Sequence, residues 1–129
     1  MKWLCLFLLS NIVFMANSQD ISAYRWKQRI VIIQEDEHEL MEAYRDSLGI
    51  KERKLIFFEA GGDALTALNT SEPIQLKKPY FLEQKYRFYL IGLDGSIKVK
   101  KESPLSQKEL FSLIDQMPMR IHEIKGGNE

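Results

Sequence analysis

The sequence predicts a single α/β domain with the element order β-α-β, a connection, and then β-β-α. Three observations support this prediction. Two runs rich in β-branched and aromatic residues, 29–34 and 53–59, flank a segment with helical periodicity. An Asp94-Gly95 turn signal joins two further strand-like segments, and a capping-box pattern opens a helix near the C-terminus. Strands buried on both faces read as continuous apolar runs, so the first two strands are expected to be parallel neighbours.

The segment from 36 to 48 is expected to be the helix that connects these two strands. Its apolar residues recur every three or four positions and therefore share one face: Leu40, Met41, Tyr44 and Leu48. Asp36 and Glu39 fit a helix start with an acidic N-cap and a Glu at the third helical position. Gly49 is expected to follow the end of the helix, where glycine is common.

The middle of the chain, from 60 to 78, is expected to form loops because it contains Gly61-Gly62, Asn69 and Pro73. The paired glycines match no phosphate-binding pattern, and we expect a plain turn there. A short helix is expected from 79 to 85, with a proline at its first position.

The second half of the domain is expected to start with a strand over 87–91 and a two-residue hairpin turn at Asp94-Gly95. The strand at 96–101 alternates, with one face formed by Ile97 and Val99 and the other by Lys98 and Lys100. Lysines in such a pattern protect an edge strand from further pairing.

The last predicted helix begins at the capping box Ser106-x-x-Glu109 and ends at Pro118. Its apolar face is formed by Leu110, Phe111, Ile114 and Met117. The chain beyond Ile121 is expected to fray, so the domain is predicted to span 19–125 and the tail 126–129.

Residues 1–18 are expected to be a cleavable secretory signal. Lys2 precedes an apolar run over 3–15, and the small residues Ala16 and Ser18 fit a cleavage site after position 18. The run is shorter than the roughly 20 apolar residues that a membrane span needs. We therefore expect a secreted or periplasmic protein with no stable membrane anchor after cleavage.

The composition of the remaining chain limits its chemistry. Cys5 is the single cysteine and lies within the predicted signal, so thiol redox activity, disulfides and cysteine–zinc sites are not expected. Loss of Lys2 changes a balance of 18 basic against 18 acidic residues to a net charge of −1. Such a balance gives no electrostatic reason to expect a nucleic-acid partner.

Three stretches together resemble a known family: WKQRI at 26–30, YLIGLDGSIK at 89–98 and ELFSLIDQMPMR at 109–120. They are similar to the peroxiredoxin-like domain family called P-DUDES, which also occurs in sushi-repeat-containing extracellular proteins and in a coiled-coil-domain matrix protein. The resemblance implies a thioredoxin-like fold. It brings no established catalytic residues.

The resemblance also shows where the redox chemistry of thioredoxin-like relatives is missing. Redox relatives carry a catalytic cysteine at the start of the first helix, where this chain has acidic residues at 35–37. They also carry a cis-proline before the third strand, where this chain has Lys85-Tyr86-Arg87. Both differences favour a non-catalytic role.

Two candidate sites follow from the residues. The cluster around Asp36 and His38 fits an acid/base or metal-assisted site, although carboxylates at a helix start also stabilise the helix dipole. Tyr80 and Phe81 flank an irregular segment and fit an exposed binding patch. A basic stripe formed by Lys77, Lys78, Lys98, Lys100 and Lys101 is more simply explained as solvated strand edges.

The function predicted from the sequence is therefore a binding module. Its expected partner is another exported protein or an envelope or matrix component, and we expect no cofactor or metal. The alternative is a non-thiol enzyme centred on Asp36 and His38.

Overall fold

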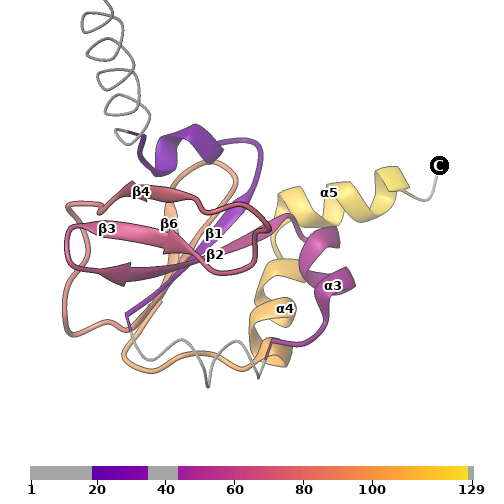
Figure 1. Cartoon of the computed structure of the whole chain (residues 1–129). Coiled ribbons are helices and arrows are strands. Elements are labelled where there is room, and N and C mark those ends of the chain that lie inside the picture. The colour runs from indigo at the N-terminus through magenta and orange to yellow at the C-terminus, as the bar shows by residue number, and fades with distance from the viewer. Residues whose placement is uncertain (1–18, 35–43, 128–129) are drawn as a thin grey trace, which may run out of the picture.

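Six strands form one mixed sheet in the computed structural model, which describes residues 19–34 and 44–127 (Figure 1). The strand order is β4-β3-β2-β1-β5-β6. The elements, in chain order, are η1 (Ile21–Tyr24), β1 (Arg29–Ile33), α3 (Ser47–Glu52), β2 (Leu55–Gly61), β3 (Ala64–Ala67), β4 (Gln75–Lys77), β5 (Phe88–Ile91), β6 (Ile97–Lys101), α4 (Gln107–Asp115) and α5 (Pro118–Gly127).

The centre of the sheet confirms the predicted α/β class. β1 runs parallel to β2, with Arg29 opposite Leu55, and antiparallel to β5, with Val31 opposite Leu90. All five residues of β1 are buried, as its continuous apolar sequence predicts. A parallel pair extended by an antiparallel hairpin is compatible with a thioredoxin-like fold.

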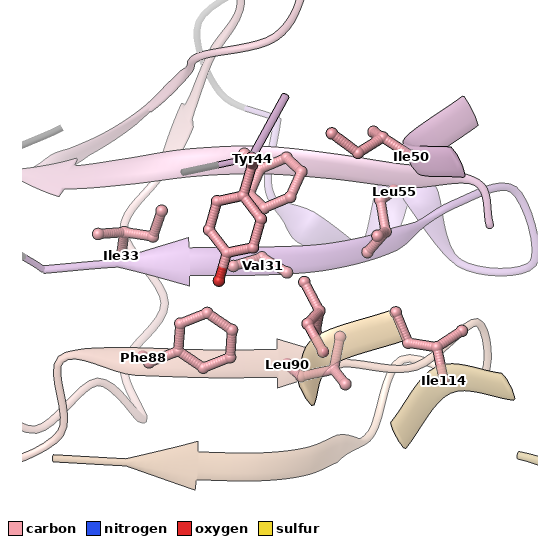
Figure 2. Packing of buried hydrophobic residues seen from close by; sticks show 10 residues of the cluster. Val31, Ile33, Tyr44, Ile50, Leu55, Phe88, Leu90 and Ile114 are labelled. Carbon is pink, nitrogen blue, oxygen red and sulfur yellow. The ribbon is translucent and has the colours of Figure 1, made fainter. Parts of the chain in front are cut away.

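The two faces of the sheet carry separate cores. One face packs against α3 and α4, which lie with α5 on the same side of the sheet in Figure 1. Figure 2 shows part of this first cluster, where Tyr44 lies over the strands near Phe88 and donates a hydrogen bond to the carbonyl of Leu105. Its buried members are Val31, Ile33, Tyr44, Ile50, Leu55, Phe57, Phe88, Leu90, Leu110 and Ile114.

The other face is covered by the short η1 and by the irregular chain around 81–86. None of the described α-helices contributes to this second cluster. Ile21, Tyr24 and Phe81 pack against this second cluster. Its buried members are Ile30, Ile32, Ile56, Phe58, Leu65, Leu76, Tyr89 and Ile91. These short segments are enough to bury the second cluster, whose members are each at most 3% exposed.

The prediction of a helix over 36–48 is wrong at the C-terminal end of that segment. Residues 44–46 are not helical, and α3 begins only at Ser47, while residues 35–43 lie outside the described part of the chain. Asp46 caps α3 by accepting a hydrogen bond from the Gly49 N–H at 2.9 Å. Leu48 points outward, with 66% of its surface exposed. The aspartate cap therefore places Gly49 inside a helix instead of after one.

Two strands within 60–78 were not predicted. β2 and β3 form a hairpin around Gly62, which has φ of +58°, and β4 pairs with β3. The predicted plain turn is present but lies at Gly62-Asp63, because Gly61 is the last residue of β2. Leu65 and Leu76 lie opposite each other, and each is the one fully buried residue of its strand. Such short, polar strands carry little periodicity for a sequence to reveal.

The helix expected from 79 to 85 is replaced by turns. Leu82 donates to the carbonyl of Pro79 and Tyr86 to that of Glu83, each across three residues. The Gln34 amide donates to the carbonyls of Glu83 (2.9 Å) and Tyr86 (2.7 Å), and so ties this segment to the end of β1. In an α-helix the carbonyl of Glu83 would accept from the backbone N–H four residues on, but here it accepts from the Tyr86 N–H and from the Gln34 side chain. The Gln34 contact, from outside the segment, stabilises the turns.

The β5–β6 hairpin is confirmed, but its loop is longer than the predicted two residues. Ile91 pairs with Ile97, and Gly95, with φ of +85°, donates to the carbonyl of Gly92. The ladder is irregular between Leu90 and Ile91. This irregularity separates Ile97 from Val99, which were expected to share a face: Val99 packs on the first cluster, whereas Ile97 stays 40% exposed.

β6 lies at one edge of the sheet, as its lysine pattern predicts. The Ser106 cap of α4 is also confirmed, because its hydroxyl accepts from the Glu109 N–H at 3.2 Å. The chain beyond Ile121 was expected to fray, but it is helical as far as the structure describes it. α5 begins at Pro118 and continues through Gly126 and Gly127, which were assigned to the tail. No helix among the described residues is long and apolar enough to cross a membrane.

Candidate functional site

Of the two candidate sites predicted from the sequence, the structure describes one. Asp36 and His38 lie outside the described residues. Tyr80 and Phe81 both line a cavity of about 530 Å³ on the face of the sheet that η1 covers. We call this cavity the η1 groove. His122, the other histidine, is exposed on α5.

Three segments far apart in the chain form the η1 groove. One side is η1 with the residues that follow it, the second is the chain at 79–81, and the third is the hairpin loop at 92–97. Ile30 and Ile91, from the adjacent central strands β1 and β5, lie at its base. The groove therefore lies between these segments, above strand residues that are themselves buried.

Aromatic side chains line two sides of the η1 groove, the segment at 79–81 and η1 itself. The Phe81 ring packs against Tyr89 in the core, with ring centroids 5.9 Å apart. Tyr80 makes an edge-to-face contact with Phe81 at 5.9 Å but leaves 99% of its surface exposed. Tyr24, from η1, packs edge-on against Phe58 at 5.8 Å, and its burial raises the pKa of its hydroxyl. Phe81 therefore anchors this segment, while Tyr80, which precedes it in the sequence, projects into solvent.

The two carboxylates of the η1 groove are already occupied by local hydrogen bonds. Asp20 caps η1 and accepts hydrogen bonds from the Ser22 hydroxyl and from the Ser22 N–H, the latter at 2.8 Å. These two bonds, the one from the hydroxyl first, lower the pKa of Asp20. Asp94 accepts from the N–H and hydroxyl of Ser96 and pairs with Lys98 at 3.0 Å. These contacts, the Ser96 hydrogen bonds first, lower the pKa of Asp94 to about 2. Both carboxylates are therefore ionised and hold turns in place.

Arg25 is the cation of the η1 groove. Its side chain crosses the hairpin loop, and a Cβ built on Gly95 would lie 3.6 Å from its Cδ. Its guanidinium lies 5.7 Å from the Trp26 ring, and among the described residues it makes no ion pair. The groove thus combines an apolar base and an exposed aromatic with one cation, Arg25, and two ionised carboxylates, Asp20 and Asp94. This chemistry suits the binding of an apolar or aromatic segment.

The sequence did not reveal a cluster of charged side chains on the opposite side of the sheet. Arg29, only 1% exposed, donates to the carbonyl of Arg53 at 2.8 Å and contacts Glu123 at 3.3 Å. Arg120 contacts Glu123 at 3.4 Å and Asp115 at 3.2 Å, and Arg53 pairs with Asp115 at 2.8 Å. We call these five residues the arginine cluster.

The arginine cluster joins β1, the end of α3, the end of α4 and α5. Although burial raises the pKa of Asp115, hydrogen bonds from Arg53 and Arg120 outweigh it and keep that pKa below its usual value. Asp115 and Arg120 belong to the IDQMPMR stretch. A charged residue at the start of an otherwise apolar strand, as in Arg29 before Ile30, was the available sequence signal.

The basic stripe is divided between distant parts of the sheet. Lys77 ends β4 at one edge, whereas Lys98 and Lys100 lie on β6 at the other. Lys100 lies 4.9 Å from the centre of the Tyr86 ring, and Lys98 pairs with Asp94. Within residues 19–34 and 44–127, no group of three or more His, Cys, Asp or Glu side chains is placed to hold a metal ion.

Comparison with known proteins gives one family. Residues 20–123 match the family model described as a domain of unknown function, DUF4174. The matched region includes η1, all six strands and α4. No curated protein and no solved structure matches the chain.

Proposed function

The chain belongs to the family described as domain of unknown function DUF4174, and we propose that it is an exported, non-catalytic binding module. Its partner is another exported protein or an envelope or matrix component. The bound part is an apolar or aromatic segment, and it lies in the η1 groove. The signal-like sequence of residues 1–18 supports export.

The observation that carries the proposal is the exposure of Tyr80 at the rim of the η1 groove. Tyrosine is enriched among the residues that dominate binding energy, because it buries a large apolar ring while its hydroxyl keeps a polar contact. Phe81 positions Tyr80, since its own ring is held against Tyr89. A partner can therefore cover Tyr80 without any rearrangement of the core.

The peroxiredoxin-like relationship suggested by the three sequence stretches remains part of this proposal. The described chain has the parallel pair and antiparallel hairpin of a thioredoxin-like domain. Its single cysteine, Cys5, lies in the predicted signal. On this proposal the fold serves recognition, and the thiol chemistry of redox relatives has been lost.

The experiment is affinity capture from the native compartment with three variants of the tagged protein. Tyr80→Ala should lower recovery of the partner about tenfold or more, because loss of an interface anchor costs about 1.4 kcal/mol or more. Lys108→Gln, at an exposed position on α4, is the matched control and should retain full recovery. Equal recovery by the Tyr80 and Lys108 variants would contradict the proposal.

The same experiment tests the enzyme alternative. An Asp36→Asn, His38→Gln double variant should capture the partner as well as the unmodified protein does. Loss of recovery in that variant, with Tyr80→Ala unaffected, would transfer the functional site to the acidic segment.

A further inference from the structure

A second cavity, of about 540 Å³, lies beside α3 and the start of β2. Its lining comes from Lys27-Gln28, from α3, from the strand start at Leu55 and from the turn at Asn69-Thr70. We call it the α3 cavity. Gln28 is the residue that it shares with the η1 groove, so the two sites are separate surfaces with one common neighbour.

Every charged side chain that lines the α3 cavity is a lysine: Lys27, Lys51 and Lys54. All three are exposed. Lys54 lies 3.7 Å from Glu123, whereas Lys27 and Lys51 make no ion pair within the described residues. Three cations around one concavity, in a chain with no net charge, create a local positive potential that attracts anions.

One of these lysines, Lys54, has a left-handed backbone conformation, and Lys27 directly follows a second residue that has one. Among the described residues, the non-glycine positions with positive φ are Lys54, at +53°, and Trp26, at +68° and directly before Lys27. Lys54 follows the end of α3, and its N–H donates to the carbonyl of Lys51 at 3.0 Å. Glycine is usual at such a position. The left-handed conformation of Lys54 ends α3 and places this lysine at the edge of the α3 cavity.

The neutral lining of the α3 cavity fits a ligand with hydroxyl groups. Ser47 contributes a hydroxyl, and the half-buried Gln28 contributes a side-chain amide that makes no hydrogen bond within the described chain. The Thr70 hydroxyl donates to the carbonyl of Glu72 at 2.8 Å, and its oxygen can still accept a hydrogen bond. Ile50 and Leu55 supply buried apolar surface at the base. Hydroxyls and an amide beside an apolar floor match the polar edges and C–H faces of a sugar ring.

We propose that the α3 cavity binds a sugar that carries a phosphate or sulfate ester. The lysines hold the ester, and the hydroxyl and amide groups hold the sugar. This site does not depend on the η1 groove or on the proposed partner.

The test is a titration of the purified, isotope-labelled protein, followed by amide chemical shifts, with four probes. These are glucose 6-phosphate, glucose 6-sulfate, glucose and inorganic phosphate. The sugar esters should shift the amides of 27–28, of α3 and of 69–70, and should bind at least tenfold more tightly than either glucose or phosphate. Binding of inorganic phosphate with equal affinity, or shifts confined to other residues, would overturn the proposal.

Three variants complete the test. Lys27→Gln with Lys51→Gln should weaken ester binding about tenfold, because each exposed charge contact contributes up to about fivefold. Lys108→Gln removes one charge elsewhere and should leave the affinity unchanged. Lys54→Gly should relieve the positive-φ strain without loss of folding stability, yet should weaken ester binding. Unchanged affinity in both the double variant and Lys54→Gly would refute the assignment.

Discussion

The buried guanidinium of Arg29 makes Glu123→Gln the most informative perturbation of the arginine cluster. The substitution keeps the size of the side chain and removes its charge. Arg29, 1% exposed, would then lose its carboxylate partner at 3.3 Å and would keep the carbonyl of Arg53. Arg120 would lose one of its two acidic contacts. An uncompensated buried cation is costly because water cannot solvate it.

The expected loss is about 2 kcal/mol of unfolding free energy. Breaking a fully buried ion pair costs about 3–5 kcal/mol. The effect here should be smaller because the Glu123 side chain is 19% exposed and because Arg29 retains one hydrogen bond. Urea unfolding followed by circular dichroism measures the difference.

Glu102→Gln provides the matched control. Glu102 pairs with Lys85 at 3.6 Å, but both side chains are 67% exposed. An exposed pair contributes about 0–1 kcal/mol, so the control should unfold almost like the unmodified protein. The reasoning is refuted when Glu123→Gln and Glu102→Gln lose the same stability within about 0.5 kcal/mol.

Two further predictions follow from the local geometry. Gly49→Ala should destabilise the domain by about 1–3 kcal/mol in urea unfolding, because its Cβ would lie 2.7 Å from the Phe111 ring and closer still to the Asp46 carboxylate; unchanged stability would disprove the close packing. The depressed pKa of Asp94 contributes stability that is present above about pH 4 and is lost as pH falls toward its folded value of about 2. Asp94→Asn should therefore differ less and less from the unmodified protein as pH is lowered from 5 to 2, and a constant difference in urea midpoints would contradict this sign.

The central sheet was predictable because its strands are uniformly apolar. Val31 lies in a strand whose five residues are all buried, and Phe57 lies among the four buried residues that begin β2, so their continuous apolar sequence indicated burial on both faces. β4 has one buried residue, Leu76, between two exposed ones, and no pattern distinguishes it from a loop. α5 was missed because its apolar residues are scattered and three of them, Met119, Ile121 and Ile124, remain exposed.

Some residues of the candidate sites could also be predicted from the sequence, and others could not. Tyr80 and Phe81 were found because adjacent aromatics in an irregular segment are unusual. Arg25 was missed because its position depends on the long β5–β6 loop, whose irregular ladder also turns Ile97 toward the η1 groove. The three lysines of the α3 cavity come from separate segments, and only the folded chain brings them together.

The most direct test of binding at the η1 groove is photo-cross-linking from inside it. A benzophenone amino acid replaces Tyr80 in one variant and the exposed Ile121 of α5 in a second. Each is expressed in the native host and irradiated. The account predicts a discrete adduct from position 80, in the exported fraction, that position 121 does not give. The same adducts from both positions, or none from position 80, would contradict it.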